Sequence, residues 1–176
     1  MKPSLVILTT IAILGAAFSS SQLMAARATP SATASANACS PLLPPQATPA
    51  GQTRMYGHIK SLTRKRHHFE LRFDPAWWLT GVPAERAAVE DKAIRPGEPV
   101  PNDYYIVDEG HRLLTFVVPT TARVTVLPGG KPCTAATSVA KLAEMVKNGN
   151  VRLGFWIRIG EKYPSPVLSV DQQYQP

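Results

Sequence analysis

Side chains that could carry out chemistry are concentrated in the stretch PNDYYIVDEGHR, residues 101 to 112. Six stand there together: Asp103, Tyr104, Tyr105, Asp108, Glu109 and His111. Carboxylates and an imidazole can transfer protons to and from a substrate, and carboxylate oxygens can also bind calcium. The stretch is therefore a candidate catalytic or calcium site, with Asp108, Glu109 and His111 as its candidate residues.

An extended backbone through the middle of this stretch favours a different interpretation. If residues 104 to 107 form a strand, Asp103 and Glu109 lie roughly 20 Å apart, which is too far to share a metal or a proton. Gly110 suits the left-handed position of a three-residue hairpin loop. We therefore expect DEGH to turn the chain between two strands, and an enzyme or calcium site is the alternative.

A second group of candidate residues is cationic. The run RKRHH begins at Arg64, and in an exported protein it could bind an anionic envelope polymer, lipid headgroups or an acidic protein partner. Export makes nucleic acid a less favoured ligand. We take Arg64, Lys65 and Arg66 as candidate ligand-binding residues, although a solvated turn that keeps the sheet edge soluble would need the same composition.

Two adjacent tryptophans complete the ligand-binding candidates. Trp77 and Trp78 cannot both face inward from an extended segment, since neighbouring side chains of a strand point to opposite faces. One is expected in the core and the other at an exposed pocket. Partial burial of both in an irregular loop is the alternative.

Several common kinds of site are not indicated. The histidines show no zinc-binding spacing, and no H-E-x-x-H or C-x-x-C motif occurs. Neither G-x-S-x-G nor a phosphate-binding glycine loop is present. These absences argue against a metal site and against the common hydrolase and nucleotide-binding classes, and we expect no cofactor.

The hydrophobic patterns predict mostly strands. YGHIKSLT (residues 56 to 63) and HFELRF (68 to 73) flank the basic run, and in the second Phe69, Leu71 and Phe73 alternate with charged residues, as in a half-buried strand. Pro75 in DPAWWLTGVP interrupts this pattern. Further strands are predicted at residues 104 to 107, 113 to 118, 123 to 127, 155 to 159 and 167 to 170.

Two helices are predicted. Pro83 can begin a short helix that extends to Ala93. From Ser138 to about Lys147, apolar residues recur at helical spacing, with Ser138 able to cap the start and Gly149 able to end the helix. The apolar positions are Val139, Leu142, Ala143 and Val146.

The order of these elements favours a mainly β fold. A strand hairpin, a further strand, an amphipathic helix and a closing hairpin match the layout of a small OB-like Greek-key barrel. Gly57 opens the first strand of this layout, and RVTVL is its third strand. Residues 75 to 118 depart from the layout as an insertion with its own helix and hairpin.

The N-terminal part indicates export. After Lys2, an apolar run from Leu5 to Phe18 is too short for a membrane span of roughly 20 residues and is typical of a signal peptide, here residues 1 to 28. An uncleaved anchor is the alternative. Loss of Lys2 and Arg27 with this peptide would lower the formal net charge from +7 to +5.

A linker and a single domain would follow. Residues 29 to 53 contain no charged side chain and cannot bury much apolar surface, so we expect a disordered linker. Residues 54 to 176 then form one β-barrel-like domain. The chain has two cysteines, Cys39 and Cys133, and in an oxidising compartment such a pair favours one disulfide.

Three strings point to a class of proteins. RFDPAWWLTG, PGEPVPNDYYIVDE and DQQYQP resemble strings of uncharacterised exported bacterial proteins, over about residues 56 to 176. The resemblance implies a periplasmic or extracellular location with no transmembrane span in the mature chain, and it implies nothing about chemistry. We expect an exported, non-enzymatic envelope or secreted binding module.

Overall fold

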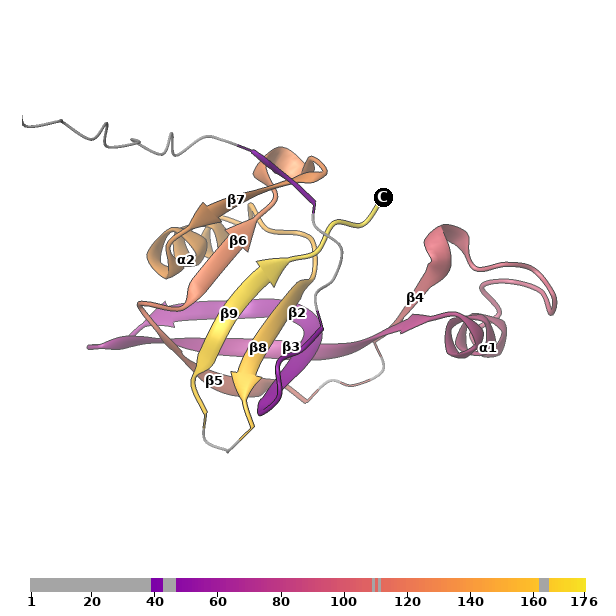
Figure 1. Ribbon diagram of the computed structural model, residues 1–176, viewed down its shortest axis with the longest axis horizontal. Coiled ribbons are helices and arrows are strands. Elements are labelled where there is room, and N and C mark those ends of the chain that lie inside the picture. The colour runs from indigo at the N-terminus through magenta and orange to yellow at the C-terminus, as the bar shows by residue number, and fades with distance from the viewer. Residues whose placement is uncertain (1–38, 43–46, 109, 111, 162–164) are drawn as a thin grey trace, which may run out of the picture. The chain divides into compact units, whose positions relative to one another are not determined.

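The two longest strands form the hairpin that the alternating pattern predicts (Figure 1). The computed structural model describes residues 39–42, 47–108, 110, 112–161 and 165–176, all within one compact unit. Strand β2 (Gln52–Arg64) pairs antiparallel with β3 (His68–Thr80), and Arg64 lies opposite Phe69. Residues 65 to 67 therefore form the hairpin tip. The alternating apolar residues of β3 are buried, as predicted: Phe69, Leu71 and Phe73.

Strand β3 continues past the proline that was expected to interrupt it. Its first half pairs with β5 (Leu114–Pro119), and residues 77 to 80 pair with β4 (Tyr104–Val107). Between these two partners, residues 74 to 76 pair only with β2. Pro75 has no backbone N–H to offer a second neighbour, so it fits the one place where that neighbour is missing.

The expected hairpin between residues 104 to 107 and 113 to 118 is wrong. Both strands pair with β3 and not with each other within the part of the chain that the structure describes. Glu109 and His111, on either side of Gly110, lie outside the described residues. The local sequence suits a turn, but pairing along the long strand β3 separates the two strands.

The remaining strands complete one mixed nine-stranded sheet in the described residues. They are β6 (Arg123–Val126), β7 (Cys133–Thr137), β8 (Phe155–Gly160), β9 (Val167–Gln172) and the short β1 (Ser40–Pro41). The order is β1-β7-β6-β9-β8-β2-β3-β4, with β5 also on β3, and only β6 and β9 are parallel. The predicted mainly β class is confirmed. The sheet is not closed into a barrel, which corrects that part of the prediction.

Both predicted helices are present. In α2 (Val139–Lys147), the Ser138 hydroxyl accepts a hydrogen bond from the Lys141 N–H at 3.1 Å. Gly149 has φ 68° and its N–H donates to Val146 O, while Asn150 N–H donates to Met145 O, which is the helix-ending arrangement expected for glycine. Helix α1 (Val82–Glu90) starts as predicted and ends three residues earlier, before Lys92 at φ 59°.

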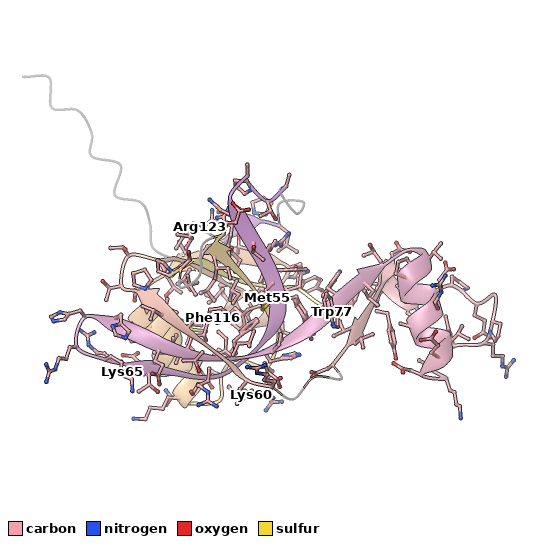
Figure 2. The ribbon with its side chains drawn as sticks, turned by 90° about the horizontal axis from the view of Figure 1, so that it is seen from below. Met55, Lys60, Lys65, Trp77, Phe116 and Arg123 are labelled. Atoms are coloured by element: carbon pink, nitrogen blue, oxygen red, sulfur yellow. A yellow bond between two sulfur atoms is a disulfide. The ribbon has the colours of Figure 1, made fainter. Side chains whose placement is uncertain are left out.

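The main core lies between helix α2 and the inner face of the sheet. Phe116 and Met55, labelled in Figure 2, belong to it. Val139 and Leu142 of α2 are buried in the same cluster as Phe155 and Ile157 of β8. A smaller apolar cluster joins α1 to the outer half of β3 and to β4. This second cluster holds the β3–β4 extension in place.

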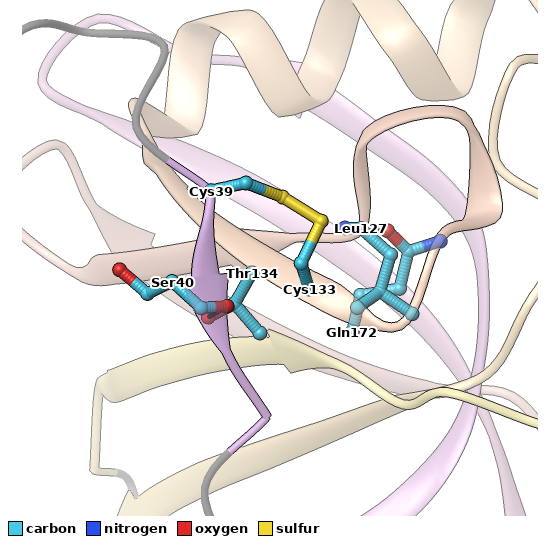
Figure 3. Close-up of a disulfide and its surroundings, with 6 residues drawn as sticks. All are labelled: Cys39, Ser40, Leu127, Cys133, Thr134 and Gln172. Carbon is cyan, nitrogen blue, oxygen red and sulfur yellow. Dashed lines mark hydrogen bonds between the residues drawn. A yellow bond between two sulfur atoms is a disulfide. The ribbon is translucent and has the colours of Figure 1, made fainter.

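The segment before β2 belongs partly to the sheet. Cys39 and Cys133 form the predicted disulfide, and β1 next to it pairs with β7 (Figure 3). Strand β2 also begins at Gln52, before the expected domain start at Arg54. The disordered linker predicted for residues 29 to 53 is therefore wrong for these parts, because the disulfide and the β1–β7 pairing order them. The predicted signal peptide and residues 29–38 and 43–46 lie outside the described residues.

No helix among the described residues is long and apolar enough to cross a membrane.

The tight contact between β2 and β3 gives a first prediction. A Cβ on Gly57 would lie 2.8 Å from Pro75 Cα and would also contact the carbonyl oxygen of Asp74. Gly57→Ala should therefore force backbone movement and lower the free energy of unfolding by about 1–3 kcal/mol, measured by denaturant unfolding. Gly110→Ala is the control, because nothing lies within 4 Å of its Cβ position. Equal stability of the two variants would contradict this account.

Candidate functional site

The sheet face that points away from the core carries a row of arginines. Along each strand alternate residues face outward, so outward residues that are partners in the register lie side by side. Arg123 of β6 is opposite Ser169 of β9, Ser169 is opposite Arg158 of β8, and Arg158 is opposite Arg54 of β2. Three arginines from three strands therefore share one row across the sheet.

The next row on the same face is aromatic and acidic. Thr125 is opposite Asp171, Asp171 is opposite Trp156, and Trp156 is opposite Tyr56. Arg54 bridges the two rows, because its guanidinium lies 4.0 Å from the centre of the Trp156 ring. This is a cation–π arrangement, which favours a charged guanidinium next to a partly buried ring.

The β3–β4 extension contributes further aromatic rings. Trp78 stacks on Tyr104 with ring centres 4.0 Å apart, and Trp78 also contacts the edges of Tyr56 and Trp156. The change of β3 partner at Pro75 is what places Trp78 and Tyr104 there. The aromatic residues thus form a continuous wall from β8 to β4.

These rows line a cavity of about 460 Å³. Its lining includes the three arginines together with Trp78, Trp156 and Asp171. Residues of the N-terminal segment next to the disulfide and of the C-terminal segment complete it: Leu42, Ala47, Thr48, Gln173, Tyr174 and Pro176. The volume lies in the range of small-molecule and cofactor sites.

Two of the arginines have no acidic partner. Neither Arg54 nor Arg158 forms an ion pair with any described residue. Burial is the main cause that lowers the pKa of Arg54; the charge of Asp171 acts in the opposite direction, and the facing Arg158 adds a smaller lowering effect. Like charges directly opposite each other in a sheet are destabilising. The pair therefore brings two positive charges together without a direct ion pair to a described residue, and Asp171 offsets part of the repulsion at Arg54.

Asp171 has a structural role at one end of the arginine row. Its carboxylate accepts hydrogen bonds from the Thr125 hydroxyl at 2.6 Å and the Ser169 hydroxyl at 2.9 Å, and Arg123 lies 3.3 Å away. These contacts use the carboxylate to hold β6 and β9 together. Arg123 is consequently the only arginine of the row that has an acidic partner within the described chain.

Tyr56 lies at the bottom of the aromatic wall and is 2% exposed. The Gln175 side-chain amide donates to its hydroxyl at 2.5 Å. Burial is the main cause that raises the pKa of Tyr56 to about 12, and the neighbouring Tyr104 adds to the shift. Gly154 makes room for the ring, because a Cβ there would lie 2.8 Å from Tyr56 Cε2.

The C-terminal residues are attached to the same aromatic wall. Trp156 Nε1 donates to Gln173 Oε1 at 2.9 Å, and the Gln173 N–H donates to Gly154 O at 2.9 Å. Leu127 N–H donates to Gln172 Oε1 at 2.8 Å, close to the disulfide (Figure 3). Side-chain amides therefore fix the segment after β9 at the edge of the cavity.

The side chains of Trp77 and Trp78 lie on opposite sides of β3, as alternation along a strand requires. Trp78 lines the cavity, whereas Trp77 is 71% exposed on the other side of the β3–β4 extension. The expected core position of one tryptophan is wrong, since β3 extends past the main core at that point. Trp78 is the one sequence-predicted binding residue that the structure places in the cavity.

The predicted basic residues lie elsewhere. Arg64, Lys65 and Arg66 are exposed at the tip of the β2–β3 hairpin, where Figure 2 shows Lys65 at the free end. Lys65 is 3.5 Å from Glu70, and Arg64 lies over the Phe69 ring at 5.6 Å. None of the three lines the cavity.

The acidic stretch does not form a recognisable site in the described residues. Asp103 is the last residue of a 3-10 turn and has φ 60°, and Asp103 and Asp108 are both exposed. Glu109 and His111 lie outside the described residues. Where side chains are described, no group of three or more metal-ligating residues occurs.

Sequence reasoning missed most of the cavity. The outward residues appear in the sequence as Arg-x-Tyr at residues 54 to 56 and as Trp-x-Arg at residues 156 to 158. Such alternation of apolar positions with arginine or aromatic side chains is a signal for a functional outer face. The register that puts the two motifs opposite each other is a long-range property.

Comparison with protein-family models, with curated proteins and with solved structures finds no match for this chain.

The raised pKa of Tyr56 predicts a pH dependence of stability. Between about pH 10 and 12 the unfolded chain loses the tyrosine proton while the folded protein keeps it. The unfolded state then binds fewer protons, so stability falls as pH rises through this window, by up to about 3 kcal/mol. Tyr56→Phe should flatten this fall in urea unfolding measured from pH 9 to 12.

A Tyr174→Phe variant controls for the loss of a tyrosine from the same cavity. If Tyr56→Phe and the unmodified chain lose stability in parallel over the window, the phenol of Tyr56 is not the group responsible.

Proposed function

We propose that this protein is a non-enzymatic binding module for an anionic ligand, which it holds in the cavity on the outer face of β2, β8 and β9. The observation that carries the proposal is the pair Arg54 and Arg158, which face each other and form no direct ion pair with any described residue. A carboxylate, sulfate or phosphate group between them would accept hydrogen bonds from two guanidinium forks.

The energetics support a binding role over a structural one. Two facing arginines cost stability in the free protein, of the order of 0.5 kcal/mol, and the core beneath them does not need their charge. An anion that enters the cavity removes this repulsion and adds charge-assisted hydrogen bonds. Partial burial strengthens both effects, because the local dielectric is lower than in water.

The sequence expectations of export and of an OB-like layout belong to the same proposal. The disulfide is consistent with a periplasmic or extracellular location, where such bonds persist. An open OB-like sheet is supported by the order β5-β3-β2-β8-β9 and by the parallel β6–β9 pair that follows it. Helix α2 before β8 fits the same layout.

The basic hairpin tip is a second candidate surface for the anionic ligand. Its side chains Arg64, Lys65 and Arg66 are exposed and consecutive in the sequence. Because exposed charges are screened by salt, contacts there would be weaker than those in the cavity. Neutralising the two surfaces separately distinguishes them.

The proposal predicts opposite effects of one substitution on stability and on binding. Arg158→Gln should remove the repulsion and raise the free energy of unfolding of the ligand-free protein by about 0.5 kcal/mol. The same variant should lose most of the stabilisation that sulfate or phosphate gives the full chain in a thermal-shift titration. Arg66→Gln, at the hairpin tip, is the matched control and should change neither quantity.

Two results would contradict the cavity as the anion site. One is equal stabilisation of the Arg158→Gln variant and the unmodified chain by the anion. The other is loss of that stabilisation in the Arg66→Gln control, which would move the binding site to the hairpin tip.

A further inference from the structure

The row formed by Arg54, Arg158 and Arg123 is longer than one anionic group. We infer, on the basis of the proposed function, that the ligand is an acidic polysaccharide chain that lies across the strands from Arg123 to Arg54. Such a ligand is a chain of sugar rings that carry carboxylate groups at intervals.

The spacing of the strands indicates more than one anionic group. Neighbouring strands lie about 4.8 Å apart, so Arg123 and Arg158, which are separated by β9, are about 10 Å apart at the backbone. Arg54 lies one strand further along the same row. Arg123 is held by Asp171 at 3.3 Å, so an anion between Arg54 and Arg158 leaves Arg123 to a second anionic group, which a chain with repeated carboxylates supplies.

The residues between the arginines favour a ligand whose charges are spaced out. Ser169, which is buried, stands between Arg123 and Arg158 in the row, and Asp171, two residues later on the same face of β9, is paired with Arg123. A chain with adjoining anionic groups would bring one of them against the Asp171 carboxylate. A sugar ring that separates two carboxylates can place its uncharged, hydroxyl-bearing part there instead.

The cavity also offers neutral polar groups for sugar hydroxyls. The side-chain amide of Asn102 and the Nε2 of Gln172 have no hydrogen-bond partner among the described residues. Both residues line the cavity. Amides that can donate suit a ligand with many hydroxyl oxygens, and the arginines alone would not distinguish such a ligand from inorganic anions.

The aromatic wall argues against a nucleic acid chain. Binding of single strands depends on open aromatic faces on which bases stack. Here one face of Trp78 is covered by Tyr104 and one face of Trp156 by Arg54. One face of each tryptophan is therefore taken up by a protein group, which reduces the open aromatic surface on which successive bases could stack.

The test compares four probes by titration of the intrinsic fluorescence of the full chain. They are galacturonic acid, tetragalacturonic acid, its methyl-esterified form and a five-nucleotide oligothymidylate. Tetragalacturonate should bind at least tenfold more tightly than the monomer and at least tenfold more tightly than the oligothymidylate. Methyl esterification removes the charges from the same backbone and should weaken binding at least tenfold.

The far end of the row is tested by Arg123→Gln. This variant should lose most of the tetramer's advantage while its affinity for the galacturonic acid monomer stays within about twofold. The slope of log affinity against log salt for the tetramer should fall by about one. Arg66→Gln is again the matched control and should bind like the unmodified chain.

The outcomes separate this inference from the proposed function. Equal affinities for monomer and tetramer, or tighter binding of the oligothymidylate, would overturn the polysaccharide while leaving an anion-binding cavity. Stabilisation by sulfate without binding of tetragalacturonate would do the same. If neither sulfate nor any of the four probes binds, both the inference and the proposed function are wrong.

Discussion

The antiparallel register between β2 and β8 determines the rest of the candidate site. It places Arg54 opposite Arg158 on the outer face, and it places Met55 opposite Ile157 on the core face. Because side chains alternate between faces, a slip of one residue would bring the arginines into the core and the apolar residues to the surface. The hydrophobic core therefore keeps two like charges together that would otherwise separate.

This constraint explains how the protein tolerates an unfavourable pair. The facing arginines cost a fraction of a kcal/mol, whereas burying a single large apolar side chain contributes about 1.5–3 kcal/mol. Next to the arginine row on the core face, Ile157 is fully excluded from solvent and Met55 packs against the core. The disulfide and the β1–β7 pairing bring the N-terminal segment to the cavity as well. The stabilisation from the core face of the sheet therefore offsets the cost of the facing arginines on its outer face.

Local sequence signals were sufficient for much of the fold. The β2–β3 and β8–β9 hairpins, both helices and the disulfide follow from alternation, capping residues and cysteine count. The predicted hairpin between residues 104 to 107 and 113 to 118 is wrong because both strands pair with different parts of β3, a long-range pairing that a local turn signal does not reveal. The extent of β3 was missed because Pro75 is compatible with a strand only where one neighbour is absent, and the missing neighbour is a tertiary property.

The candidate site was harder to predict than the fold for a related reason. Alternation shows which side chains of one strand share a face, but only pairing between strands shows which rows they form. Trp78 was a candidate because it stands next to Trp77 in the sequence. Arg54, Arg158 and Arg123 are separated by dozens of residues in the chain, so no local pattern groups them. In contrast, the conspicuous run from Arg64 to Arg66 lies at a hairpin tip, where consecutive charges are the expected composition of an exposed turn. Arginines that face each other from different strands are therefore stronger evidence for an anion site than arginines that are consecutive in sequence, because only the former require the fold to hold like charges together.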